Sequence, residues 1–139
     1  MNKVKTVMNE LIVEAKIENM DAVLGFVGKE LEDCPSKIRN QIMIAVDEIF
    51  SNIARYAYDT GIGAAAVRIA AGDDIIVEFE DSGMAYNPLT ADNPDTTLPA
   101  EERVIGGLGI YMVKNIMDSV EYRREGNKNI LTIKKKGVR

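Results

Sequence analysis

The sequence predicts a two-layer α/β sandwich of the α+β class, in which three helices cover one face of a mixed, mostly antiparallel sheet. Segments with strand and helix periodicity follow in the order strand, helix, helix, strand, strand, loop, helix, strand, strand. Two pairs of strands are joined by short turns, so hairpins outnumber crossovers and antiparallel pairing should predominate. The 139 residues are 46% hydrophobic and show no repeat or internal boundary. Residues 1–139 are therefore expected to form a single domain.

The N-terminal half is expected to hold one strand and two helices. Residues 7–17 alternate between apolar and polar side chains, which predicts a half-buried strand. Asn19 and Ser36 are suited to cap two helices, over about residues 20–31 and 37–58. The second helix has a broad apolar face and a narrow polar seam, so it should be mostly buried with the seam facing something polar. The seam residues are Gln41, Glu48, Asn52, Arg55 and Asp59.

The C-terminal half is expected to hold two hairpins and a third helix. The strands, which alternate with period two, are expected over residues 65–71, 75–79, 120–123 and 130–133. Residues 84–105 form a polar stretch without a clear period, and a loop of this length in a compact domain is usually functional or mobile. A helix reaching about residue 118 follows Gly106-Gly107-Leu108-Gly109.

Composition and charge exclude several classes of function. The net charge of −5 argues against a general binder of nucleic acid or of anionic membranes. No apolar run approaches the roughly 18 residues of a membrane-spanning helix, and residues 1–5 lack a signal-peptide core, so a cytoplasmic protein is expected. Cys34 is the single cysteine and there is no histidine, which excludes an internal disulfide, a cysteine metal cluster, histidine-ligated zinc and histidine-activated nucleophiles.

Glu48 and Asn52 form the first candidate site. They are four residues apart on the second predicted helix, so their side chains point the same way among apolar neighbours. Burying a carboxylate and an amide without partners is costly. In one interpretation Glu48 is a base beside the Asn52 oxygen, which ligates a hard cation such as Mg²⁺. In the other, the two residues form a partly exposed seam in which Glu48 pairs with Arg55 or a lysine.

Two glycine-containing segments are the second and third candidates. In Asp81-Ser82-Gly83, Asp81 could accept a hydrogen bond from an amine of a base and Gly83 could admit a flat ring. The alternative is an ordinary turn. Gly106-Gly107-Leu108-Gly109 opens a helix whose N-terminal amides suit phosphates, the alternative being a flexible linker. It matches neither a Walker A loop nor a Rossmann fingerprint. With the helix seam, these segments could place metal, base and phosphate contacts in one cavity.

In this order the motifs resemble those of the GHKL ATPase superfamily, which has the Bergerat fold. Within it, they look most like the anti-sigma-factor serine/threonine kinases of bacterial partner-switching systems. Residues 46–52, Val-Asp-Glu-Ile-Phe-Ser-Asn, resemble the N-box, residues 81–85, Asp-Ser-Gly-Met-Ala, the G1 box, and residues 106–110, Gly-Gly-Leu-Gly-Ile, the G2 box. The resemblance covers nearly the whole chain. It implies a histidine-kinase-like ATPase domain with an ATP lid over about residues 84–108.

The resemblance implies ATP and Mg²⁺ as ligands and gives the motif residues their roles. Glu48 falls at the catalytic base and Asn52 at the residue that ligates magnesium. Asp81 falls at the residue that binds the adenine amino group, with Gly83 beside the ring. The remaining nucleotide-binding residues that the resemblance implies are Arg103, Gly106, Gly107, Leu108 and Gly109, and Arg103 would reach a terminal phosphate.

Two positions differ from the family pattern. Ala85 stands where the G1 box normally has its second glycine, so its methyl group is either tolerated or narrows the adenine pocket. Tyr56 stands four residues after Asn52, where these kinases often have a histidine. This second difference bears on kinase activity more than on nucleotide binding.

The function that the resemblance implies is transfer of the ATP γ-phosphoryl group to a serine of an anti-sigma-factor antagonist of the STAS type. A sigma factor would be the second partner, which the protein sequesters, and a homodimer is compatible with the resemblance. Three alternatives remain open. They are a non-catalytic module that binds ATP and a partner, a detached ATPase domain of a histidine kinase acting on another chain, and an interaction domain without a nucleotide.

Overall fold

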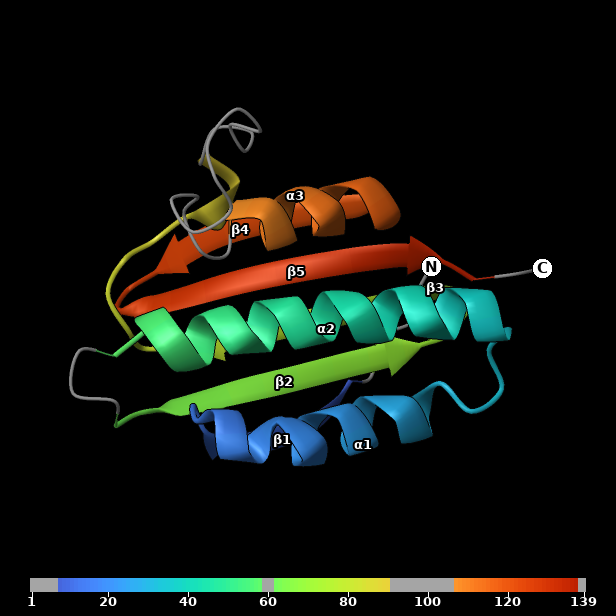
Figure 1. The fold of residues 1–139 in the computed structure, drawn as a ribbon, viewed down its shortest axis with the longest axis horizontal. Coiled ribbons are helices and arrows are strands. Elements are labelled where there is room, and N and C mark those ends of the chain that lie inside the picture. Colours follow the sequence, from blue (N-terminus) through green and yellow to red (C-terminus); the bar gives the residue numbers. More distant parts are fainter. Residues whose placement is uncertain (1–7, 59–61, 91–106, 138–139) are drawn as a thin grey trace, which may run out of the picture.

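The computed structural model describes residues 8–58, 62–90 and 107–137, which form a five-stranded sheet and three α-helices (Figure 1). The strands are β1 (Asn9–Glu14), β2 (Ala64–Ala71), β3 (Asp74–Asp81), β4 (Ser119–Glu125) and β5 (Lys128–Lys136). The helices are α1 (Met20–Glu30), α2 (Ser36–Tyr56) and α3 (Gly107–Ile116), with short 3₁₀ turns η1 (Ile17–Asn19) and η2 (Pro88–Thr90). All predicted elements are present, with ends shifted by a few residues.

The strands lie in the order β1-β2-β3-β5-β4, and every pairing among the described strands is antiparallel. The predicted two-layer, mostly antiparallel architecture is confirmed, but the parallel pairing that a mixed sheet requires is not found among these strands. The reason is the position of β5. The crossover through α3 makes β3 and β4 run in the same direction, and β5 inserts between them and pairs antiparallel with both.

The three helices lie on the same face of the sheet, with α2 between α1 and α3 (Figure 1). The core fills the space between the two layers, and α2 and the central strands supply most of its large buried side chains. These include Ile42, Ile49, Phe50, Val67, Ile69, Val77, Phe79 and Ile133. Within the described ranges no helix has the length and hydropathy needed to span a bilayer.

The two predicted helix caps are wrong in detail. The side chain of Asn19 precedes α1 but does not cap it, because its Nδ2 donates to the carbonyl oxygen of Glu14 at 2.8 Å. Ser36 is the first helical residue of α2, and the N-cap position is held by Pro35, whose backbone is extended. The Pro35 carbonyl accepts the first helical hydrogen bond from the amide of Arg39 at 3.0 Å. Helix α2 therefore starts without a side-chain cap.

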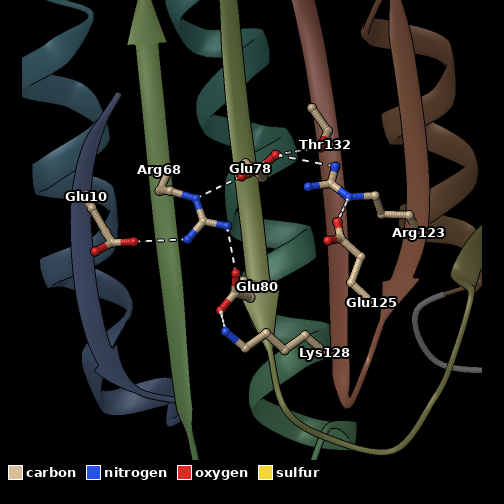
Figure 2. Close-up of polar contacts among 8 residues, drawn as sticks. All are labelled: Glu10, Arg68, Glu78, Glu80, Arg123, Glu125, Lys128 and Thr132. Carbon is tan, nitrogen blue, oxygen red and sulfur yellow. Dashed lines mark hydrogen bonds and ion pairs between the residues drawn. The ribbon is translucent and has the colours of Figure 1, made fainter. Parts of the chain in front are cut away.

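The opposite face of the sheet carries a cluster of charged side chains drawn from all five strands (Figure 2). Arg68 on β2 lies at its centre and donates to Glu10, Glu78 and Glu80 at 3.0, 2.8 and 2.9 Å. Lys128 on β5 lies 3.2 Å from the second oxygen of Glu80. Arg123 on β4 pairs with Glu125 and lies 3.7 Å from Glu78, which also accepts from Thr132 at 3.4 Å. This cluster connects the strands across their solvent-facing side.

Candidate functional site

A pocket of about 530 Å³, which includes space open to solvent, opens between α2, α3 and the ends of the central strands. Its walls are mostly apolar, and three amide or carboxylate side chains, Asn52, Asp81 and Asn129, project into it. Such a surface, apolar with a few convergent polar groups, is typical of small-molecule sites. The remaining lining residues are Ile49, Ile53, Tyr56, Ala57, Phe79, Met84, Tyr86, Pro88, Ile110, Tyr122 and Leu131.

Asn52 reaches the pocket from the polar seam of α2. Its Oδ1 atom is buried and has no hydrogen-bond partner in the described parts of the chain. An orphaned buried acceptor costs on the order of 1–3 kcal/mol, so this oxygen suits a ligand that supplies a donor or a cation. Amide oxygens are acceptable ligands for hard cations such as Mg²⁺, which usually completes its shell with water and substrate phosphates. The residues described here hold no acidic or cysteine cluster that could bind a metal by itself, so Asn52 Oδ1 is the protein oxygen that the pocket offers to such a cation.

Glu48 lies one helical turn before Asn52 and is half-buried, outside the residues that line the pocket. No ion pair or hydrogen bond of its carboxylate is found among the residues that the structure describes, so the pairing with Arg55 or a lysine is not observed there. Its Oε2 lies against the first turn of α3. A Cβ atom at Gly109 would overlap it, so glycine at this position allows the close approach. A carboxylate next to a helix N-terminus is electrostatically favoured.

Asp81 is the last residue of β3 and is 7% exposed. Its Oδ1 accepts hydrogen bonds from the amide of Gly83 at 2.9 Å and from Nδ2 of Asn129 at 3.0 Å. Its Oδ2 has no hydrogen bond within the described ranges. One oxygen is therefore fixed by the protein, and the other remains an acceptor at the pocket wall.

Asn129, which was not among the expected site residues, lies directly opposite Asp81 in the β3–β5 register. Its Nδ2 also donates to the Met84 carbonyl at 2.9 Å. Its Oδ1 accepts from Tyr122 Oη at 2.5 Å, from Arg124 at 3.1 Å and from the Tyr86 amide at 3.3 Å. Strand periodicity could have identified it, since Asn129 shares its parity with the buried Leu131 and Ile133. A polar residue at a buried parity needs partners or a ligand.

Gly83 packs closely against the end of α2. It is buried against the end of α2, where a Cβ atom would overlap the Ala57 carbonyl group. The same carbonyl accepts a hydrogen bond from the amide of Met84 at 3.0 Å. Glycine therefore allows the turn after β3 to pack directly on α2, and Gly83 is not one of the residues that line the pocket.

The structure describes the predicted glycine-rich segment only from the start of α3. Helix α3 begins at Gly107, and Gly109 faces Glu48 as described above. Arg103 and Gly106 lie outside the described residues, and the surroundings of Gly107 and Leu108 are not described. Tyr56, at 45% exposure, lies on the pocket wall one turn after Asn52. The structure thus brings Asn52, Asp81 and Tyr56 to one pocket.

The sequence matches a known domain family over most of its length. The family model described as histidine kinase-like ATPase domain matches residues 13–135. A serine-protein kinase RsbW of Bacillus pumilus is 30% identical over 118 residues, which span 79% of this chain and 68% of the relative. A serine-protein kinase RsbW of Bacillus mycoides is 24% identical over 116 residues, spanning 80% of this chain and 68% of the relative.

A solved structure shares the fold. The crystal structure of the RsbU and RsbW domains of Rv1364c from Mycobacterium tuberculosis superimposes with a TM-score of 0.65 at 14% sequence identity. The match covers 96% of this chain but only 33% of that longer chain. At this identity the likeness concerns the fold.

Proposed function

Because this chain belongs to the histidine kinase-like ATPase domain family, as its motifs predicted, we propose that it is an ATP-dependent serine/threonine protein kinase. The observation that carries the proposal is that one mostly apolar pocket contains the orphaned Asn52 Oδ1 and also Asp81, whose Oδ2 makes no hydrogen bond within the described ranges. The first suits a cation and the second suits an amine. A nucleotide bound to magnesium offers both, joined by a flat ring that suits the apolar walls. Relatives named serine-protein kinases support a serine side chain as the group that receives the phosphoryl group.

In this proposal the pocket recognises adenine through Asp81. Asp81 Oδ1 already accepts hydrogen bonds from Gly83 and Asn129. Oδ2 would accept from the exocyclic amino group, while a carbonyl at the same ring position would place two acceptors against each other. Phe79 and Leu131 supply apolar surface beside it.

The polar seam of α2 would bind the magnesium of the nucleotide and orient the serine that receives the phosphoryl group. Asn52 Oδ1 would hold Mg²⁺, which when bound neutralises charge on the phosphate oxygens. Glu48 would orient the acceptor hydroxyl and take its proton as the oxygen bonds to the γ-phosphorus and the bond to ADP breaks. Arg103, Gly106, Gly107, Leu108 and Gly109 are proposed to surround the phosphates, as lid residues do in this superfamily.

The proposed acceptor is a serine of an anti-sigma-factor antagonist of the STAS type, and the proposed second partner is a sigma factor. Both follow from the kinase resemblance and from relatives named RsbW. A cytoplasmic location and a homodimer are part of the same proposal.

Glu48→Gln tests the mechanism. The variant, the wild type and Asp47→Asn, a matched change at the exposed neighbouring position, are incubated with γ-labelled ATP, Mg²⁺ and an antagonist encoded beside this chain. Wild type and Asp47→Asn should label a serine, and Glu48→Gln should lose transfer while its Kd for ATP stays within a few-fold, because the base contributes about 10²–10⁴-fold to rate and little to binding.

The other possible outcomes would indicate either a different catalytic base or a different function. Transfer that persists in Glu48→Gln would show that another group is the base. ATP binding without a phosphoprotein would favour the non-catalytic module, and labelling of a histidine on another chain would favour the detached histidine-kinase domain. Absence of ATP binding would leave an interaction domain.

A further inference from the structure

Tyr58 connects three segments through one hydroxyl group. It follows α2 by two residues, and its Oη accepts a hydrogen bond from the Ser82 amide at 2.8 Å. The same Oη donates to the Ala64 carbonyl at the start of β2 at 2.6 Å. The ring packs on Gly63, where a Cβ atom would overlap it. A single phenol thus joins the end of α2, the start of β2 and the turn after β3.

Tyr58 and its neighbour Ala57 bind the turn that follows Asp81 from the α2 side, while Arg124 and Asn129 bind its Gly83 and Met84 carbonyls from β4 and β5. Tyr58 Oη binds the Ser82 amide, and the Ala57 carbonyl binds the Met84 amide at 3.0 Å. Between these two points lies Gly83, packed on Ala57. The Gly83 amide donates to Asp81 Oδ1 at 2.9 Å. The turn therefore supplies one of the two hydrogen bonds that orient the Asp81 carboxylate, and Asn129 Nδ2 supplies the other.

We propose that Tyr58 is a positioning residue for base recognition, a proposal that rests on the proposed function. Its hydroxyl fixes the turn at residues 82–84 so that Asp81 keeps Oδ1 bonded to the protein and presents Oδ2 to the base. Tyr58 is not among the residues that line the pocket, so it acts through the turn and does not touch the ligand. Since the turn is bonded to the end of α2, the same contact holds Asp81 in register with Asn52 on that helix.

Tyr58→Phe removes the hydroxyl and keeps the ring against Gly63. We expect the Kd for Mg-ATP to rise about tenfold, the loss that one or two neutral hydrogen bonds can cause. The Kd for Mg-tripolyphosphate, which has no base, should stay unchanged, and the preference for ATP over GTP should fall. The matched control is Tyr111→Phe, an exposed tyrosine on α3 outside the pocket lining, which should bind all three ligands as the wild type does. Binding is measured by calorimetry below the melting temperature of each variant.

Gly83→Ala is a second variant that moves the same turn without altering the phenol. Its Cβ would push the turn away from Ala57, so the same base-selective loss is expected even if Tyr58→Phe does not fold. Wild-type affinity and wild-type discrimination in the folded Tyr58→Phe variant would overturn the inference. So would an equal loss for ATP and tripolyphosphate, because that pattern marks a general loss of structure. If the wild-type protein binds no ATP, the proposed function itself is refuted. That result is distinct from the two outcomes that overturn only the role of Tyr58.

Discussion

Asn129 shows at the residue scale how the pocket is held together. It is 8% exposed and makes five hydrogen bonds, one each to Asp81, Met84, Tyr86, Tyr122 and Arg124. Both donors of the amide are used, and three donors share the two lone pairs of its oxygen. The side chain fixes Asp81 and joins β4 and β5 to the loop after β3.

Asn129→Leu should destabilise the protein as well as weaken ligand binding. The substitution keeps the volume but leaves partners of the amide without their hydrogen bonds, and each buried orphan costs about 1–3 kcal/mol. We expect the free energy of unfolding, measured by urea titration, to fall by at least that amount. Asn127→Leu in the exposed turn two residues earlier is the control and should change stability by less than about 0.5 kcal/mol. Equal stability of Asn129→Leu and wild type would mean that the network contributes nothing to folding.

The residues that could be predicted from the sequence are those whose signal is local. Glu48 and Asn52 were predicted because helical spacing puts them on one face, and Asp81 because it ends a strand. Strand parity marks Asn129 as a buried polar residue, but its partner Asp81, like the partner of Tyr58, lies in a segment far away in the chain. No local pattern reveals that Asn129 lies opposite Asp81 or that the Tyr58 hydroxyl reaches the Ser82 amide.

At the scale of the elements, local patterns predict the strands and helices but not the order in which the strands pair. Period-two and helical patterns predicted each strand and helix, since those patterns depend on neighbours within the element. The insertion of β5 between β3 and β4 depends on which strands meet in space, so the sheet was expected to be mixed when its described pairings are all antiparallel. The charged cluster of Figure 2 depends on the same register, with Arg68 opposite Glu78 across the β2–β3 pair.

The charged cluster should make the sheet sensitive to acid. Burial acts to raise the pKa of Glu80, but the hydrogen bonds and charges of Arg68 and Lys128 outweigh it and lower that pKa below its usual value. Burial also opposes the charge of Arg68, yet its three carboxylate partners raise its pKa above the usual range. Glu80 therefore contributes stability above its unfolded pKa, and this contribution is lost as the pH falls through its folded pKa.

Glu80→Gln should reduce that dependence on pH. As the pH falls below the usual pKa of glutamate, the wild type should lose more unfolding free energy than the variant, because only the wild type protonates Glu80. The control is Glu121→Gln, an exposed carboxylate on β4, which should follow the wild-type profile. Chemical denaturation at a series of pH values measures the difference, and identical slopes for wild type and Glu80→Gln would refute the role of Glu80.

At the scale of the whole molecule, α2 carries most of the proposed machinery. It holds Glu48 against α3, presents Asn52 to the pocket, and at its end Ala57 and Tyr58 hold the turn after β3. A ligand that bridges Asn52 and Asp81 would therefore stabilise contacts between both layers of the sandwich. Ligand binding and global stability should change together.

Asn52→Leu should separate the stability of the free protein from its response to ligand. Replacing the amide by an apolar group of similar size removes the orphaned Oδ1, so without ligand the variant should be as stable as the wild type or more stable, by up to about 1–3 kcal/mol. Mg-ATP at 100 times its Kd should stabilise the wild type by about 2.7 kcal/mol. At the same concentration the variant should gain much less, and chelating Mg²⁺ should reduce the gain of the wild type alone. Asn40→Leu, an exposed change on the same helix, should keep the full gain. The Asn52 oxygen does not serve as a cation ligand if Asn52→Leu is less stable than the wild type without ligand. The same holds if Mg-ATP stabilises the variant as much as it stabilises the wild type.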